Sequence, residues 1–178
     1  MTYYGAKEIV AAFRLVRGNT ITIAEEIPED KYGFKPSPDV RTVGRTLVHI
    51  AAMPSLQLNL QKNRVTDLKT VNFRELIGAI LAEEEKPRSK ADILTYLKTE
   101  ADRFAGFVDG LSEQTLAEIV TMVPGATPAT KSRLEMLLTV KEHEMHHRGQ
   151  LMVVQRMLGL VPHLTRQMLA RMAQPAAT

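Results

Sequence analysis

Three of the five histidines in this chain lie within the segment 141–150, which reads KEHEMHHRGQ. His143 and His147 are four residues apart, so on an α-helix they share one face, with about 5–6 Å between their Cβ atoms. Two imidazoles at this spacing can bind one metal ion, because neutral imidazole is a ligand for zinc, nickel, copper and iron. Two ligands do not make a selective site, so a third ligand must come from elsewhere in the chain.

The segment 131–158 is expected to form one long helix that ends at Gly159, a residue type favoured just after a helix. At 100° per residue, one stripe of this helix carries Met136, Val140, His143, His147, Leu151, Val154 and Leu158. His143 and His147 therefore face the core. His146 points about 80–100° away, and we expect it at the surface or as a support for the ligands.

The best candidate for the third ligand is His49. A helix starting near Thr42, a suitable N-cap residue, would carry His49 on the same face as Met53, Leu56 and Leu60. Pro54 cannot donate a hydrogen bond to the carbonyl of Ile50, so a kink or restart is expected about one turn beyond His49.

Alone, His49 would be read as a hydrogen-bonded core histidine. Together with two more inward-facing imidazoles it favours a metal site, because burying three such groups is costly unless a cation organises them. Three protein ligands leave at least one coordination position open, which is typical of catalytic rather than structural zinc. The predicted metal ligands are therefore His49, His143 and His147. The ion is a divalent transition metal, with zinc or nickel favoured and iron or manganese as alternatives.

The remaining elements follow from apolar periodicity and helix caps. We expect helices over 6–26, from Asn72 through Ile80, from Ser89 to Gly110, and over 164–172. Residues 30–41 and 63–70 are expected as connectors, 83–88 as a solvated charged turn, and 117–130 as a loop with at most one short strand. His163, beside Pro162, is expected to be a surface residue at a helix start.

Four long amphipathic segments predict an all-α protein in which a helical bundle surrounds one core. The connector from about residue 63 to 88 is long enough to cross the bundle. We expect one domain over residues 1–178, with the bundle at about 5–160 and a short C-terminal helix at about 163–173.

Composition excludes or disfavours several functions. The chain has 178 residues and no cysteine, so disulfides, thiolate metal sites and a cysteine nucleophile are excluded. The 23 Lys and Arg residues are dispersed among 20 Asp and Glu residues, with a net charge of +3, which disfavours nucleic-acid binding. No membrane-spanning stretch or secretory signal is visible, so a cytoplasmic location is expected.

These residues resemble the DinB/YfiT-like family of metalloenzymes. The matching pieces are Lys35-Pro36-Ser37-Pro38 leading to Thr42-Val43-Gly44, then Leu47-Val48-His49-Ile50-Ala51, and His143-Glu144-Met145-His146-His147-Arg148-Gly149-Gln150-Leu151. The likeness covers most of residues 5–162. Pro54 and the sequence Val161-Pro162-His163 depart from the family pattern and are expected to reshape the rim of the pocket.

The resemblance implies an up-down-down-up four-helix bundle, a metal triad at His49, His143 and His147, and a homodimer. It implies an enzyme acting on a small molecule, with a transferase or isomerase that uses a small external thiol favoured. The alternatives are a metal-dependent hydrolase and a stress-response protein that binds metal or ligand without turnover. Gln150 and Arg45 lie near the histidine faces and are candidates for orienting substrate.

Overall fold

The computed structural model describes residues 4–174. Its helices are α1 (Ala6–Glu26), α2 (Val43–Ala52), α3 (Pro54–Lys62), α4 (Phe73–Glu85), α5 (Lys90–Asp109), α6 (Glu113–Ala117), α7 (Arg133–Met157) and α8 (His163–Met172). Two 3-10 turns, η1 (Glu29–Lys31) and η2 (Leu68–Thr70), and two strands, β1 (Ile119–Thr121) and β2 (Thr130–Ser132), complete the described elements.

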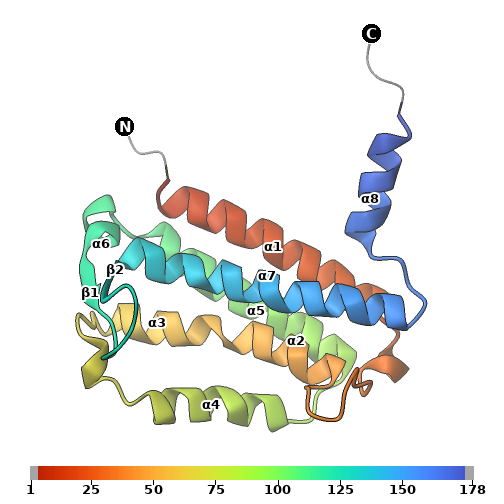
Figure 1. Cartoon of the computed structure of the whole chain (residues 1–178), viewed down its shortest axis with the longest axis horizontal. Coiled ribbons are helices and arrows are strands. Elements are labelled where there is room, and N and C mark those ends of the chain that lie inside the picture. Colours follow the sequence, from red (N-terminus) through yellow and green to blue (C-terminus); the bar gives the residue numbers. More distant parts are fainter. Residues whose placement is uncertain (1–3, 175–178) are drawn as a thin grey trace.

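The bundle is built from α1, the consecutive pair α2 and α3, α5 and α7 (Figure 1). α1 and α7 run in one direction along the bundle, whereas α2–α3 and α5 run in the other. α4 lies outside this set and carries the chain back along the bundle between α3 and α5. The structure thus confirms the all-α, up-down-down-up four-helix bundle with a long crossover connection and a short C-terminal helix.

The starts of α2 and α5 lie where their caps predicted them. The Thr42 side chain accepts a bond from the amide of Arg45 at the start of α2, and Ser89 with Asp92 forms a capping box at the start of α5. Pro54 occupies the first turn of α3, where its missing amide costs least, so the helix restarts there. Gly159 follows α7 with φ of 78°, a left-handed conformation that favours glycine.

The loop prediction for residues 117–130 was wrong in part. Ile119–Thr121 pairs antiparallel with Thr130–Ser132. The second strand begins at the last residue of the predicted loop and continues over Lys131 and Ser132, which were expected to lie at the start of the long helix, so α7 begins at Arg133. Val120 in β1 is fully buried, which gives this strand an anchor in the core. β2 has only three residues, all polar, so its strand conformation depends on pairing with β1. No local sequence pattern identifies it as a strand.

One buried charged group connects the four helices of the bundle near the site. Arg17 of α1 is 1% exposed, and its Nε donates to both carboxylate oxygens of Glu144 on α7, at 2.9 and 3.0 Å. Its Nη1 donates to the carbonyl of Leu97 on α5, and its Nη2 donates to that of Ile50 on α2. Ile50 and Glu144 each follow a histidine of the predicted triad, so Arg17 fixes the relative positions of α2 and α7.

No helix in the stretch 4–174 combines the length and the apolar character needed to cross a membrane.

Candidate metal centre

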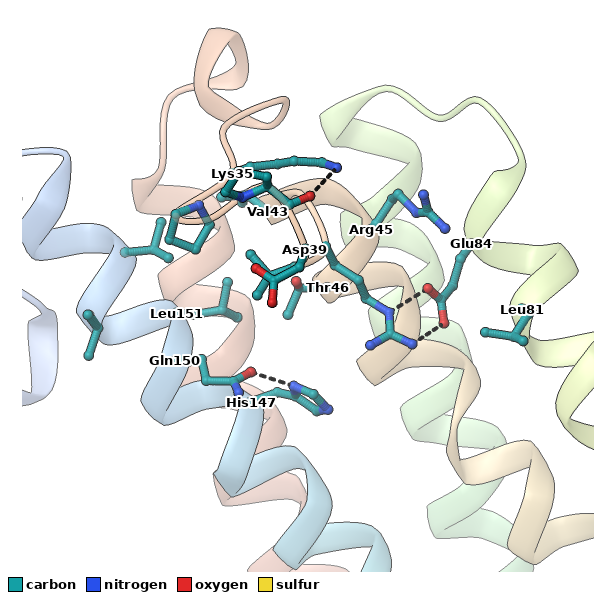
Figure 2. A pocket seen from close by; sticks show the side chains of 16 residues that line it. Lys35, Asp39, Val43, Arg45, Thr46, Leu81, Glu84, His147, Gln150 and Leu151 are labelled. Atoms are coloured by element: carbon teal, nitrogen blue, oxygen red, sulfur yellow. Dashed lines mark hydrogen bonds and ion pairs between the residues drawn. The ribbon is translucent and has the colours of Figure 1, made fainter.

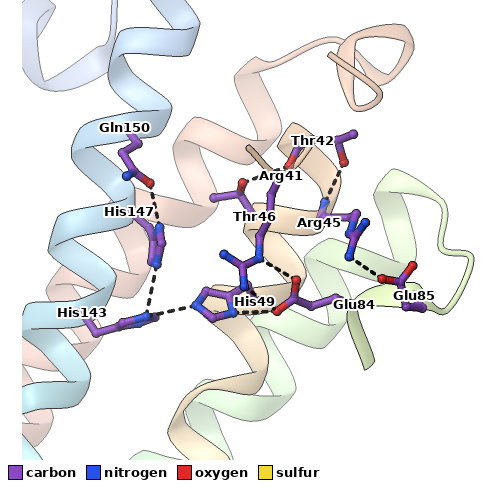
Figure 3. A network of polar contacts seen from close by, with 10 residues as sticks. All are labelled: Arg41, Thr42, Arg45, Thr46, His49, Glu84, Glu85, His143, His147 and Gln150. Carbon is purple, nitrogen blue, oxygen red and sulfur yellow. Dashed lines mark hydrogen bonds and ion pairs between the residues drawn. The ribbon is translucent and has the colours of Figure 1, made fainter. Parts of the chain in front are cut away.

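The three predicted ligands converge from two helices. His49 comes from α2, and His143 and His147 lie one turn apart on α7 (Figure 3). Nε2 of His143 lies 3.1 Å from Nε2 of His49 and 3.1 Å from Nε2 of His147. One ligand atom from each residue lies within 4.8 Å of the others, and no other His, Asp or Glu of residues 4–174 joins this group.

Two of the three rings are oriented by a bond at the opposite nitrogen. Nδ1 of His49 lies 2.7 Å from Oε1 of Glu84, and Nδ1 of His147 lies 2.8 Å from Oε1 of Gln150. A carboxylate or amide oxygen can only accept, so Nδ1–H is the donor in both contacts. The proton is therefore on Nδ1, and Nε2 of each ring presents a lone pair to the centre of the triad.

This donor set fits a divalent transition metal. Two lone pairs point at Nε2 of His143, and that nitrogen has at most one proton to give, so protein hydrogen bonds alone cannot satisfy all three rings. A cation at the centre satisfies all of them. Tetrahedral coordination by imidazole at ~2.0–2.1 Å separates ligand atoms by about 3.3 Å, close to the 3.1 Å between Nε2 of His143 and Nε2 of each of the other two histidines.

All three imidazoles are held in the neutral form that binds metal. Burial, together with the charges of the other two ligands, lowers the pKa of His143 from 6.5 to about 4. Burial also lowers the pKa of His49 and of His147, outweighing the bonds to Glu84 and Gln150, which raise it. The site therefore stays deprotonated at a pH where free histidine is charged.

Glu84 is a functional residue that the sequence interpretation missed. The segment 83–88 was expected to be a solvated turn, but α4 extends to Glu85 and the side chain of Glu84 is fully buried. Glu84 also accepts bonds from Nε of Arg41, at 2.6 Å, and from Nη2 of Arg41, at 3.2 Å. Burial raises the pKa of Glu84, but the bonds from Arg41 and His49 outweigh it, so the pKa is lowered and the carboxylate is charged.

A sequence signal for Glu84 does exist. Glu84 lies one turn beyond Ile80, the buried residue of α4, so an acid occupies the apolar face of that helix. Buried acids need a partner, and this one has both a histidine and an arginine. Arg41, in the connector before α2, has no periodic pattern that could have identified it.

The other candidates have different positions. His146 is exposed and lies outside the triad, as expected. Its Nε2 lies 3.1 Å from Nε2 of Gln150, and its ring lies edge-on against that of His147. Gln150 does reach the site, through His147. Arg45 lines the cavity beside the triad, and its guanidinium pairs with Glu85 at the end of α4. The surface prediction for His163 was wrong: it is 5% exposed and its Nε2 lies 3.1 Å from Oδ1 of Asn19, because the first turn of α8 lies against α1.

A cavity of about 690 Å³ opens beside the triad (Figure 2). Its polar lining includes His147, Gln150, Glu84, Arg41 and Thr46. The apolar lining consists of Pro36, Pro38, Val40, Val43, Leu81, Leu151, Val153 and Val154. This volume is in the range of small-molecule sites.

Comparisons with known proteins agree with this architecture. The chain is 23% identical over 154 residues to YjoA of Bacillus subtilis, covering 86% of this chain and 91% of YjoA. The crystal structure of that DinB-like protein superimposes with a TM-score of 0.62 at 22% identity, over 85% of this chain and 92% of YjoA. YfiT of Bacillus subtilis superimposes with a TM-score of 0.67 at 15% identity, over 90% of this chain and 91% of YfiT. YfiT is described as a probable metal-dependent hydrolase with an unusual four-helix bundle topology.

The sequence model of the DinB superfamily matches residues 12–151, a range that contains all three histidines of the triad. This chain belongs to the DinB superfamily.

Proposed function

We propose that this protein is a metal-dependent enzyme whose divalent ion is held by His49, His143 and His147. The observation that carries the proposal is the convergence of three Nε2 atoms, two of them with their lone pairs fixed inward, at the edge of a small-molecule cavity. A divalent ion bound there would lower the pKa of a water or thiol and supply a nucleophile near neutral pH.

The chain's own residues have separate tasks in this proposal. Glu84 and Gln150 hold the His49 and His147 rings in one tautomer and one orientation, the usual role of groups behind metal-binding histidines. Arg17 fixes the backbone of α2 next to His49 and, through Glu144, that of α7 next to His143. The cavity walls around Leu81, Leu151 and Val154 exclude water from one side of the substrate.

Hydrolysis is the first reaction to test, because YfiT, which shares the fold, is described as a probable metal-dependent hydrolase. Transfer of an external thiol to an electrophile is the second candidate. It is favoured by a cavity large enough for two small reactants, whereas the lack of cysteine fits an external thiol and hydrolysis equally. Homodimer formation stays a prediction.

A reaction screen tests the proposal. Protein loaded separately with zinc, nickel, iron(II) or manganese is assayed on model esters and amides, and on small thiols paired with an aryl halide. We expect turnover with at least one metal, and none with metal-free protein or with His143→Ala. Equal turnover by loaded and metal-free protein would contradict the proposal. Ordered metal without turnover on any substrate would favour the non-catalytic binding alternative.

A further inference from the structure

Only two of the three guanidinium nitrogens of Arg41 donate hydrogen bonds within residues 4–174. One edge of the group, formed by Nε and Nη2, is bonded to Glu84 at 2.6 and 3.2 Å. Nη1 has no acceptor within residues 4–174, and the Arg41 side chain is 34% exposed. Figure 3 shows the guanidinium beside His49, with one nitrogen directed away from Glu84 toward the side of His147. The N–H groups on the Nη1 side of Arg41 are therefore available as donors next to the triad; we call this side the free edge of Arg41.

Arg41 lies between the triad and the cavity. Its guanidinium is bonded to Glu84, which also accepts a bond from His49. Arg41 also lines the cavity together with residues of α2, α4 and α7. The free edge therefore faces both the triad and the space available to a ligand.

Carboxylates of the chain do not neutralise this region fully. The single charge of Glu84 is shared between Arg41 and His49. Asp39, the other acidic residue of the cavity lining, accepts a bond from Ser37 at 2.5 Å and keeps its negative charge. Glu84 and Asp39 therefore face three cations of the lining, Lys35, Arg41 and Arg45, and neutral imidazoles leave the charge of a bound divalent ion uncompensated. A ligand carrying negative charge would balance the site.

We propose that the free edge of Arg41 is the anion-binding subsite of the cavity, and that the substrate carries a carboxylate or similar anionic group on an apolar body. The planar donor edge matches a carboxylate in a bidentate arrangement. The apolar body lies against the proline, valine and leucine side chains of the cavity wall. This inference rests on the proposed function and names the substrate class of the same site.

The test compares two ligands of equal shape, hexanoate and hexanamide, by calorimetric and NMR titration of folded, full-length protein. Both zinc-loaded and metal-free forms are used, so binding is read without activity. Wild-type protein is expected to bind hexanoate more tightly than hexanamide. Arg41→Gln should weaken hexanoate binding by about tenfold or more, because bonds to charged groups are strong, and should leave hexanamide binding unchanged.

The matched control is Arg14→Gln, which removes a positive charge from an exposed ion pair with Asp102 away from the cavity lining. It should bind both ligands as wild type does. Arg41→Lys keeps the charge without the planar edge, so it should retain part of the preference. It also carries the test if Arg41→Gln fails to fold.

Two results would overturn the subsite. One is equal hexanoate affinity in the Arg41 variants and Arg14→Gln. The other is a folded Arg41 variant that loses zinc but still prefers hexanoate to hexanamide as wild type does. That result would show that Arg41 supports Glu84 and the metal without binding the anion. If wild-type protein holds no zinc, the proposed function fails, whereas titration of the metal-free forms still decides whether Arg41 binds the anion.

Discussion

Replacing Glu84 by glutamine tests how the metal centre is supported. The substitution keeps the size of a fully buried side chain and removes the charge that His49 and Arg41 share. Loss of a carboxylate behind a metal-binding histidine typically costs 10–100-fold in metal affinity. That range corresponds to about 1.4–2.7 kcal/mol of binding free energy. The unfolding free energy should fall by only about 1–2 kcal/mol, less than for a fully buried pair, since the Arg41 side chain is 34% exposed and water can solvate it.

The zinc affinity is measured by competition with a chromogenic chelator, and stability by urea unfolding of the metal-free protein. Glu85→Gln is the matched control, because Glu85 is the next residue of α4 and pairs only with Arg45 in an exposed contact. We expect wild-type zinc affinity for Glu85→Gln and a loss of at least tenfold for Glu84→Gln. Equal affinity in the two variants would refute the view that Glu84 organises His49.

Three further predictions concern the same framework. Gln150→Ala should reduce zinc affinity by less than about tenfold in the chelator assay, because Gln150 is exposed and water can replace its bond to His147. A larger loss of zinc affinity than for Glu84→Gln would contradict the lesser role of Gln150. Arg17→Ala should destabilise the protein by about 3–5 kcal/mol in urea unfolding, since it leaves the Glu144 carboxylate buried and unpaired; a cost below about 1 kcal/mol would argue against a structural role. The unfolding free energy of the metal-free protein should be independent of His143 protonation above pH 6.5. It should fall by about 2–3 kcal/mol as the pH is lowered to about 4, because His143 binds a proton in the unfolded chain in that interval and does not in the folded chain. An unfolding free energy that stays constant between these pH values would count against burial of the triad.

Local sequence patterns predicted most of the helices and the three histidines. The spacing of His143 and His147 and the position of His49 in an apolar stripe are properties of single helices, so periodicity alone could assign them to inward faces. Caps at Thr42 and Ser89 marked helix starts, because the capping bonds join residues three apart in the chain.

Features that depend on contacts between distant segments could not be predicted in the same way. Glu84 is 35 residues from His49, and only the packing of α4 against α2 brings the two together. His163 is buried and bonded to Asn19, which is 144 residues away. β2 forms because β1 offers a partner: of its three residues only Thr130 favours a strand, which is too little for a local prediction. The residues that support the site were therefore less predictable than its three histidines.

Metal analysis of purified protein by plasma mass spectrometry tests the central claim most directly. Wild type, His49→Ala, His143→Ala and His147→Ala are compared after expression with equal metal supply. His146→Ala removes an exposed histidine of the same helix and serves as the control. We predict about one transition-metal ion per chain in wild type and in His146→Ala. The three triad variants should contain far less while remaining folded by circular dichroism. Wild-type metal content in all three triad variants would contradict the account.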